Sequence, residues 1–319
     1  MSLGELQGRS ILVTGAGGFV GPHLARALVA HGATVHGCGL GEPPAGTPLA
    51  SWRTLDLADP EGLRETVRRT APDGVVHLAG QSSAARSFEA PEETMRANVV
   101  GTWNLLDAVR QAAPKARVVA VGTSEAYGPC EPGTRLAEDA PFKPVSPYAL
   151  SKATADQMAA SFAGVHGLDV VRARPFGHTG PGQTDRFVVP AWAKQIAAAE
   201  AGRAEPVLRV GNLEVTRDLS DVRDIVLGYI ALLTRGTRGA AYNLCRGEGT
   251  ALTDVLAKLV ALARVPVRHE VDPARLRPAD VPWLVGDPSL AARDCGWSVT
   301  RPLDDTLRDV LDDWRARGA

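Results

Sequence analysis

The chain has 319 residues, of which 45 % are hydrophobic, so it can bury a core as one domain or as two closely joined ones. Its 35 lysine and arginine residues balance 36 aspartate and glutamate residues, and this argues against the positive field that nucleic-acid and membrane-surface binding require. No apolar run reaches the roughly 18 residues of a membrane span, and the polar start lacks the features of a signal peptide. We expect a cytoplasmic protein without a membrane or nucleic-acid partner.

The four cysteines form no metal-binding pattern. They are scattered along the chain, with no CxxC pair and no Cys/His spacing, at Cys38, Cys130, Cys245 and Cys295. Free thiols in a reducing compartment are the expected state, and no metal site is expected.

Short β-branched apolar runs alternate with helical patterns over the first 175 residues. The runs are SILVT (10–14), ATVHGC (33–38), DGVVHLA (73–79), ARVVAV (116–121) and LDVVRAR (168–174). Strands this apolar are buried on both faces, and their alternation with helices predicts a parallel, doubly wound sheet. The predicted fold class is therefore Rossmann-like α/β.

A glycine-rich turn follows the first run and opens a helix. Gly15, Gly18 and Gly21 permit a tight turn and let backbone N–H groups approach a pyrophosphate closely. The strand, turn, helix and second strand predict binding of NAD or NADP. The second strand ends in HGCG (36–39), which offers neither an acidic residue for the ribose of NAD nor an arginine for the 2′-phosphate of NADP, so the preference stays open.

Asp56 follows the third predicted strand and has two interpretations. Its carboxylate can accept a hydrogen bond from the adenine amino group, or it can cap the N-terminus of the next helix.

The segment SPYALSK (146–152) predicts a helix that carries a reactive pair. Ser146 is a good N-cap and Pro147 a good first residue, so Tyr148 falls in the first turn and Lys152 on the same face. A helix N-terminus and a nearby ammonium both favour a phenolate, and we expect them to lower the pKa of Tyr148 toward neutrality. The tyrosine would then exchange a proton with a hydroxyl or ketone.

After residue 175 turn clusters and shorter periodic stretches dominate. We expect residues 1–175 to form the dinucleotide-binding domain, and residues 176–215 and 246–319 a smaller lobe. Residues 192–202 and 218–233 have helical patterns and residues 240–244 a strand pattern, so the segment from about 216 to 245 is expected to return to the first domain.

Together these motifs resemble the extended short-chain dehydrogenase/reductase superfamily of nucleotide-sugar enzymes. The resemblance rests on GAGGFVG, HLAGQSS, ANVVGTWNLL, VGTSEAYG, SPYALSK, RARPF and VGNLEVTRDLSDVRD. It implies that Tyr148 is the general acid/base, that Lys152 also holds the nicotinamide ribose and that Thr123 binds the reacting sugar oxygen. The implied cofactor contacts are Gly15, Gly18, Phe19, Val20, Gly21, Asp56, Leu57, Leu78, Ala79, Gly80, Tyr148, Lys152 and Pro175.

The second lobe is similar to GDP-4-keto-6-deoxy-mannose reductases and GDP-mannose 4,6-dehydratases through HTGPGQ, FVVPAWAKQI and DPARLRPADVP. The implied substrate contacts are Ser124, His178, Arg217 and Arg277, and the two arginines would bind the phosphates. Alternatively, the arginines form surface ion pairs and His178 has a structural role. The family carries Asn before this histidine, whereas this chain has Gly177, so a polar contact to the substrate is missing.

Glu125 leaves the reaction type open. A 4-ketone reductase needs a hydride and a proton donor, whereas a 4,6-dehydratase also needs a base, and dehydratases carry that base where this chain has Glu125. The second-lobe motifs favour the reductase; the alternatives are a dehydratase, a 4-epimerase or a dinucleotide sensor without chemistry.

The resemblance also implies a homodimer, formed by helices near residues 92–112 and 147–166. Apolar residues at helical spacing, including Met95, Val99, Trp103 and Leu106, fit such an interface, although an internal core face would look the same.

Overall fold

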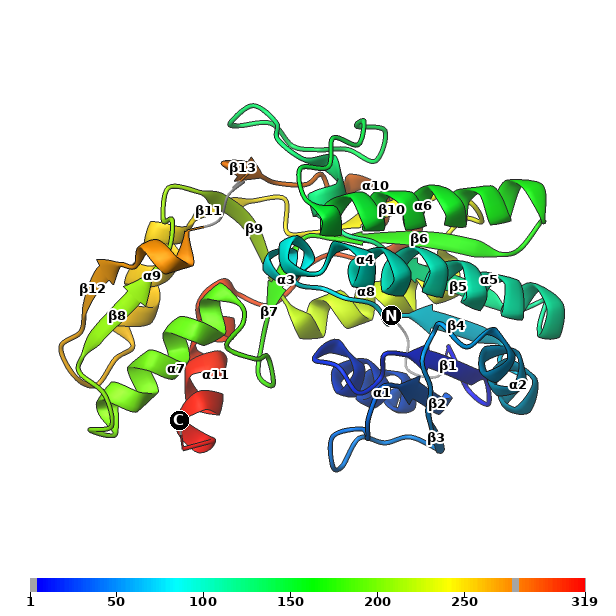
Figure 1. The fold of residues 1–319 in the computed structure, drawn as a ribbon, viewed down its shortest axis with the longest axis horizontal. Helices are drawn as coiled ribbons and strands as arrows, with labels where there is room; N and C mark the ends of the chain where they lie inside the picture. The colour runs from blue at the N-terminus through cyan, green and yellow to red at the C-terminus, as the bar shows by residue number, and fades with distance from the viewer. Residues whose placement is uncertain (1–4, 277–280, 319) are drawn as a thin grey trace.

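The computed structural model describes residues 5–276 and 281–318. Figure 1 shows two lobes, a larger one built on a wide sheet and a smaller one containing α7, α9 and α11, with β7 and β9 running between them. The chain passes between the lobes more than once, because α8 and β10 lie with the larger lobe.

A seven-stranded parallel sheet forms the larger lobe, in the order β10-β6-β5-β4-β1-β2-β3. Its strands are β1 Ser10–Thr14, β2 Thr34–Gly39, β3 Ser51–Thr54, β4 Gly74–His77, β5 Arg117–Val121, β6 Val170–Pro175 and β10 Ala241–Leu244. The strand order reverses between β1 and β4, and ligands of such sheets bind beyond the carboxyl ends of the strands at this switch point. The predicted Rossmann-like fold is confirmed.

Helices cover both faces of the sheet. One apolar core contains residues of α1 Val20–Ala30 and α8 Val222–Arg235, with α10 Ser289–Cys295 against α8. The other contains residues of α2 Pro60–Thr70, α5 Gly101–Ala112 and α6 Pro147–Val165. Three short helices precede α5: α3 Ala84–Glu89, α4 Pro91–Met95 and the π-helix η1 Arg96–Val100.

The smaller lobe has an apolar core of its own. It lies among α7 Val188–Glu200, α9 Leu252–Ala261, α11 Leu303–Ala316 and the parallel strands β8 Val207–Val210 and β12 Arg268–Val271. A second small sheet joins β9 Thr216–Asp221 to β7 Gly177–Thr179, β11 Gly249–Ala251 and β13 Trp283–Leu284. The 3₁₀ helices are η2 Ser124–Tyr127 and η3 Pro273–Arg275.

The prediction of a helix over residues 218–233 is wrong at its start. Asp221 is the N-cap and accepts from the backbone N–H of Arg223, so α8 begins at Val222 and the preceding residues form β9. The backbone of residues 218–221 pairs with β7 and β11, and this pairing makes the segment a strand. The carboxylate of Asp218 also accepts from the N–H groups of Arg246 and Gly247 at 2.9 and 2.8 Å. β9 lies in the small sheet, and α8 and β10 lie with the large one.

The described residues contain four free thiols, at Cys38, Cys130, Cys245 and Cys295. Within residues 5–276 and 281–318, no helix is long and apolar enough to cross a membrane, and no group of three or more His, Cys, Asp or Glu is placed to hold a metal ion.

A buried histidine links the centre of the sheet to α5. The two ring nitrogens of His77, at the end of β4, lie 2.7 Å from the hydroxyl of Thr14 and 3.0 Å from that of Thr102. Burial, together with the positive charge of Lys152, lowers the pKa of His77 to about 3. The ring therefore stays neutral in the folded protein at any mildly acidic pH.

This pKa predicts a contribution to acid instability. The unfolded chain takes up a proton at His77 below about pH 6.5 and the folded chain does not, so stability falls with pH, by about 2 kcal/mol between pH 7 and pH 5 from this group alone. We expect His77→Gln to be less stable than the parent at pH 7 but to lose less stability between pH 7 and pH 5. Urea unfolding of both proteins at the two pH values measures this difference; equal losses would contradict the assignment.

Candidate active site

The glycine turn after β1 is packed backbone to backbone against the end of β4. A Cβ on Gly15, whose φ is +71°, would lie 2.6 Å from the backbone nitrogen of Ala79, and a Cβ on Gly21 would lie 2.1 Å from the carbonyl oxygen of Ala16. The turn leads directly into α1, whose first N–H groups lack partners within the helix. These residues fit the pyrophosphate of a dinucleotide at the switch point of the sheet.

The other predicted cofactor residues lie at or just beyond the carboxyl ends of strands. Val20 begins α1, Leu57 follows β3, Leu78 and Ala79 follow β4, and Pro175 ends β6. The alternative interpretation of Asp56 as a helix cap is wrong. Asp59 caps α2, because its carboxylate accepts from Gly62 N, whereas exposed Asp56 accepts from Ala58 N at 2.9 Å.

Asn98 is a positioning residue that the motifs did not single out. Its side chain accepts from Gln81 N at 2.8 Å and donates to Gln81 O at 3.0 Å and to the hydroxyl of Ser151 at 2.8 Å. The Ser151 hydroxyl donates in turn to the carbonyl of Tyr148 at 2.7 Å. Asn98 thus ties the loop at Gly80 to the first turn of α6. In the sequence it stands within the ANVVGTWNLL motif, for which the resemblance implied no site residue.

Tyr148 and Thr123 meet at the N-terminus of α6. The Ser146 hydroxyl caps this helix by accepting from Ala149 N at 3.1 Å, as predicted. The buried phenol of Tyr148 is hydrogen-bonded to the side chain of Thr123, which lies just beyond β5. One side chain from the sheet edge and one from the helix start therefore present two hydroxyl groups at the same point.

The expected lowering of the Tyr148 pKa is wrong for the protein alone. Burial raises this pKa, the negative charge of Glu125 raises it further, and only the hydrogen bond from Thr123 opposes them. The phenol of Tyr148 is consequently protonated at neutral pH.

Lys152 lies on the same helix face and is also buried. Its ammonium donates to the carbonyl of Val121 at 2.7 Å, and burial lowers its pKa to about 8, against the opposing charge of Asp156. Asp156 is itself held by Arg172 and Arg174 at 2.6 and 2.9 Å. This cluster fixes the lysine at the end of β5.

Glu125 is half-buried in η2, two residues beyond Thr123. Its negative charge contributes to the raised pKa of Tyr148. The structure thus brings Thr123, Glu125, Tyr148 and Lys152 to one edge of the sheet. This arrangement can move a proton to or from a substrate oxygen.

His178 connects the glycine turn to the smaller lobe. Its ring is stacked on that of Phe19 with centroids 6.3 Å apart, and its Nδ1 lies 2.9 Å from the carbonyl of Phe176. A Cβ on Gly177 would lie 2.8 Å from the carbonyl oxygen of Asp218, because β7 runs close beside β9. Asparagine, which the resembled family carries at this position, would require the two strands to separate.

The remaining predicted substrate residues are spread over both lobes. Ser124 is buried at the start of η2. Arg217 lies on β9, where its guanidinium donates to the carbonyl oxygens of Thr216 and Val281 at 2.9 and 2.6 Å. Arg277 lies outside the described residues.

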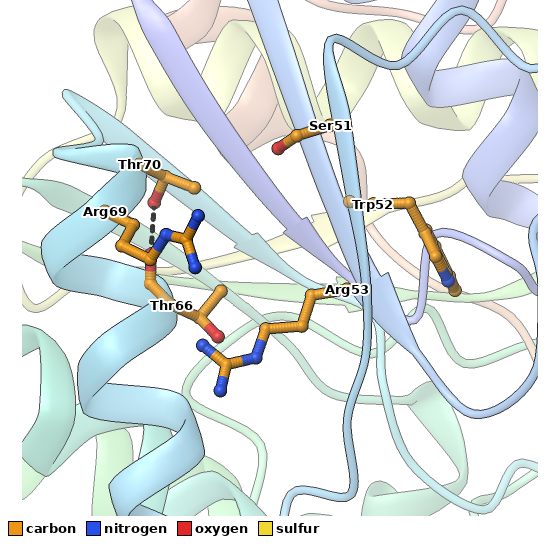
Figure 2. Close-up of a pocket in the computed structure, with 7 residues that line it drawn as sticks. Ser51, Trp52, Arg53, Thr66, Arg69 and Thr70 are labelled. Atoms are coloured by element: carbon orange, nitrogen blue, oxygen red, sulfur yellow. Dashed lines mark hydrogen bonds between the residues drawn. The ribbon is translucent and has the colours of Figure 1, made fainter.

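A cavity of about 340 Å³ lies between β3 and α2, lined by Gly37, Ser51, Trp52, Arg53, Thr66, Arg69 and Thr70. Figure 2 shows Arg53 extending from the strand toward the helix. Because Thr66 and Thr70 belong to the C-terminal half of α2, the cavity is directed toward the amino ends of the strands and away from Tyr148. It is separate from the candidate active site.

Comparisons with known proteins cover nearly the whole chain. The sequence profile of the GDP-mannose 4,6 dehydratase family matches residues 12–310. The GDP-6-deoxy-D-mannose reductase of Pseudomonas aeruginosa is 33% identical over 311 residues, which cover 96% of this chain and 97% of that protein.

Two solved structures extend the likeness to three dimensions. RMD from Pseudomonas aeruginosa, complexed with NADPH, matches with a TM-score of 0.85 and 32% identity over 97% of this chain and 99% of its own. The Thermus thermophilus UDP-glucose 4-epimerase in complex with NAD matches with a TM-score of 0.84 and 30% identity, over 96% and 98% of the two chains. The chain therefore belongs to the GDP-mannose 4,6-dehydratase family of extended short-chain dehydrogenases/reductases, as its motifs predicted.

Proposed function

We propose that this protein is an NAD(P)H-dependent reductase of the C4 ketone of a nucleotide-linked 4-keto-6-deoxy sugar, similar to GDP-6-deoxy-D-mannose reductase. The observation that carries the proposal is the near full-length similarity to a reductase: the GDP-6-deoxy-D-mannose reductase of Pseudomonas aeruginosa is 33% identical over 96% of this chain. The hydrogen-bonded hydroxyl groups of Tyr148 and Thr123 supply the proton donor that reduction of a ketone requires.

The residues at the sheet edge have distinct roles in this reaction. A bound NAD(P)H supplies the hydride that is added to the C4 carbonyl carbon. Tyr148 donates its phenolic proton to the carbonyl oxygen, while the Thr123 hydroxyl donates a hydrogen bond to the same oxygen and orients it. Lys152 holds the ribose next to the nicotinamide and stabilises the phenolate left on Tyr148 through its positive charge.

The two lobes divide the binding of the reactants. The seven-stranded lobe would bind the dinucleotide through the glycine turn. The smaller lobe would bind the nucleotide diphosphate through Arg217 and Arg277. The sugar would then lie between the lobes, beside Ser124 of η2 and His178 of β7. The free thiols and the net charge of −1 fit a cytoplasmic enzyme that acts on a small soluble substrate.

A 4,6-dehydratase is the second candidate, because the negative charge of Glu125 contributes to the raised pKa of Tyr148. In that reaction Glu125 would remove the proton at C5 of the sugar while the C6 hydroxyl leaves as water. The family profile, which carries the dehydratase name, also supports this alternative.

An assay with each substrate separates the two reactions. We expect GDP-4-keto-6-deoxy-mannose to oxidise NADH or NADPH stoichiometrically, with a sugar product two hydrogens heavier by mass spectrometry. Loss of water from GDP-mannose, without net change in the nicotinamide absorbance, would instead assign the dehydratase.

Variants at the sheet edge test the roles of the two acidic groups. Tyr148→Phe should lower kcat by roughly 10²- to 10⁴-fold, because the proton donor is lost, while coenzyme binding remains. Glu125→Gln should keep kcat within about tenfold, because a reductase needs no base at C5. A loss for Glu125→Gln as large as that for Tyr148→Phe would argue for the dehydratase.

The pKa of Lys152 predicts the alkaline limb of the pH profile. Because kcat/KM reports ionisations of the free enzyme, it should fall as the ammonium loses its proton above about pH 8. Lys152→Arg, which stays charged, should lower activity and move this limb beyond pH 10. Steady-state kinetics from pH 6 to pH 10 measure both profiles, and an unmoved limb in the arginine variant would exclude Lys152 as its source.

We also propose that two copies associate through the face formed by α3, η1, α5 and α6. Exposed apolar side chains gather on these elements: Phe88, Val100, Trp103 and Leu150, with Trp103 half exposed at 50%. Its ring packs edge-on against Phe162 of α6. An exposed apolar surface across packed helices suits a four-helix contact between copies.

Trp103→Glu should convert the dimer to a monomer, since it places a charge at the centre of that surface. Val271→Glu, at an equally exposed apolar residue on β12 of the smaller lobe, is the matched control and should leave the dimer intact. Light scattering after gel filtration gives the mass of each; a monomeric parent protein would rule out this interface.

A further inference from the structure

We propose that Glu42 makes this enzyme prefer NAD(H) over NADP(H) by placing its carboxylate where the 2′-phosphate of NADP would lie. The inference rests on the proposed dinucleotide site and assigns the preference that the end of β2 leaves open. Glu42 lies in the connection between β2 and β3, outside the glycine-rich turn that follows β1.

The start of this connection, at Gly41 and Glu42, is hydrogen-bonded to the end of β3. The indole Nε1 of Trp52 donates to the carbonyl of Gly41 at 3.1 Å and to the Thr54 hydroxyl at 3.2 Å. The Thr54 hydroxyl lies 3.2 Å from the carbonyl oxygen of Gly41 and 3.5 Å from a carboxylate oxygen of Glu42. These contacts hold Glu42 beside the carboxyl ends of two adjacent strands.

The same residues lie against the glycine turn. A Cβ on Gly17 would be 3.4 Å from the outer edge of the Trp52 ring and 3.7 Å from the carbonyl oxygen of Glu42, and a Cβ on Gly39 would be 3.3 Å from that ring. Glu42 therefore lies between the glycine turn, which is the proposed pyrophosphate site, and Thr54. Thr54 is two residues before Asp56, the predicted adenine contact. In a Rossmann fold the adenosine ribose lies between these two places.

Within residues 36–54, no lysine or arginine side chain is directed to this point. Arg53 is the only lysine or arginine between residues 36 and 54. It is the β-sheet neighbour of Cys38, and Figure 2 shows its side chain running toward α2, where it lines the cavity with Thr66 and Arg69. Trp52, on the opposite face of the same strand, is the side chain that reaches the glycine turn.

The negative charge of Glu42 would then discriminate between NAD and NADP. A carboxylate accepts hydrogen bonds from the 2′- and 3′-hydroxyl groups of the NAD ribose, whereas it repels the dianionic 2′-phosphate of NADP. This chain should therefore differ from the Pseudomonas relative, whose solved structure is complexed with NADPH.

Equilibrium binding without a sugar substrate tests the inference independently of catalysis. Nicotinamide fluorescence should give a Kd for NADPH at least about tenfold higher than that for NADH. The ratio should shrink as salt rises from about 0.02 to 0.5 M, because screening weakens repulsion at an exposed site. Equal affinities, or tighter binding of NADPH, in the parent protein would overturn the proposal.

Variants identify the residue responsible. Glu42→Gln should reduce the NADPH/NADH Kd ratio by about tenfold, and Glu42→Arg should reverse the preference. Glu131→Gln, at an exposed glutamate in a loop of the other half of the sheet, is the matched control and should keep the parent ratio. A ratio unchanged in Glu42→Gln would refute the assignment, and binding of neither coenzyme by the parent would contradict the proposed function itself.

Discussion

The close approach of the glycine turn to the end of β4 is the constraint on which the site depends. Gly15 and Ala79 meet through their backbones at the switch point of the sheet, and no side chain fits between them. This contact sets the start of α1 against the loop at Gly80, which Asn98 connects to α6 through Ser151. The cofactor cradle and the Tyr148 helix are therefore positioned by one continuous set of backbone and buried polar contacts.

Electrostatics within the site follow from burial as much as from charge pairs. Tyr148 and Lys152 share a helix face, yet burial raises the pKa of the phenol and lowers that of the ammonium. Tyr148 is consequently a protonated phenol, and the ammonium of Lys152 beside it loses its proton more easily than an exposed lysine. A protonated phenol suits proton donation to a ketone. Glu125 adds a negative charge that strengthens the hold of the phenol on its proton.

Apolar runs and capping residues correctly predicted those strands and helix ends that depend on interactions between residues close in the sequence. The strands at 10–14 and 116–121 and the helix that starts after Ser146 follow from apolar runs and capping residues. The patterns failed where long-range contacts decide. Residues 218–221 form a strand because their backbone pairs with β7 and β11, and the Tyr148 pKa depends on a burial that spacing does not reveal. Asn98 lies within the ANVVGTWNLL motif, but the sequence assigned it no role because its partner Ser151 is distant in the chain. Glu42 was not singled out because it lies beyond the end of β2.

Transfer of label from the coenzyme tests the central claim most directly. The protein would be incubated with NADH carrying deuterium on the transferred C4 position and GDP-4-keto-6-deoxy-mannose, in ordinary water. The account predicts a reduced sugar with one deuterium at C4, oxidised NAD in equal amount, and no label elsewhere. A sugar that is not reduced, with the labelled NADH left unconsumed, would contradict the assignment of this site to ketone reduction.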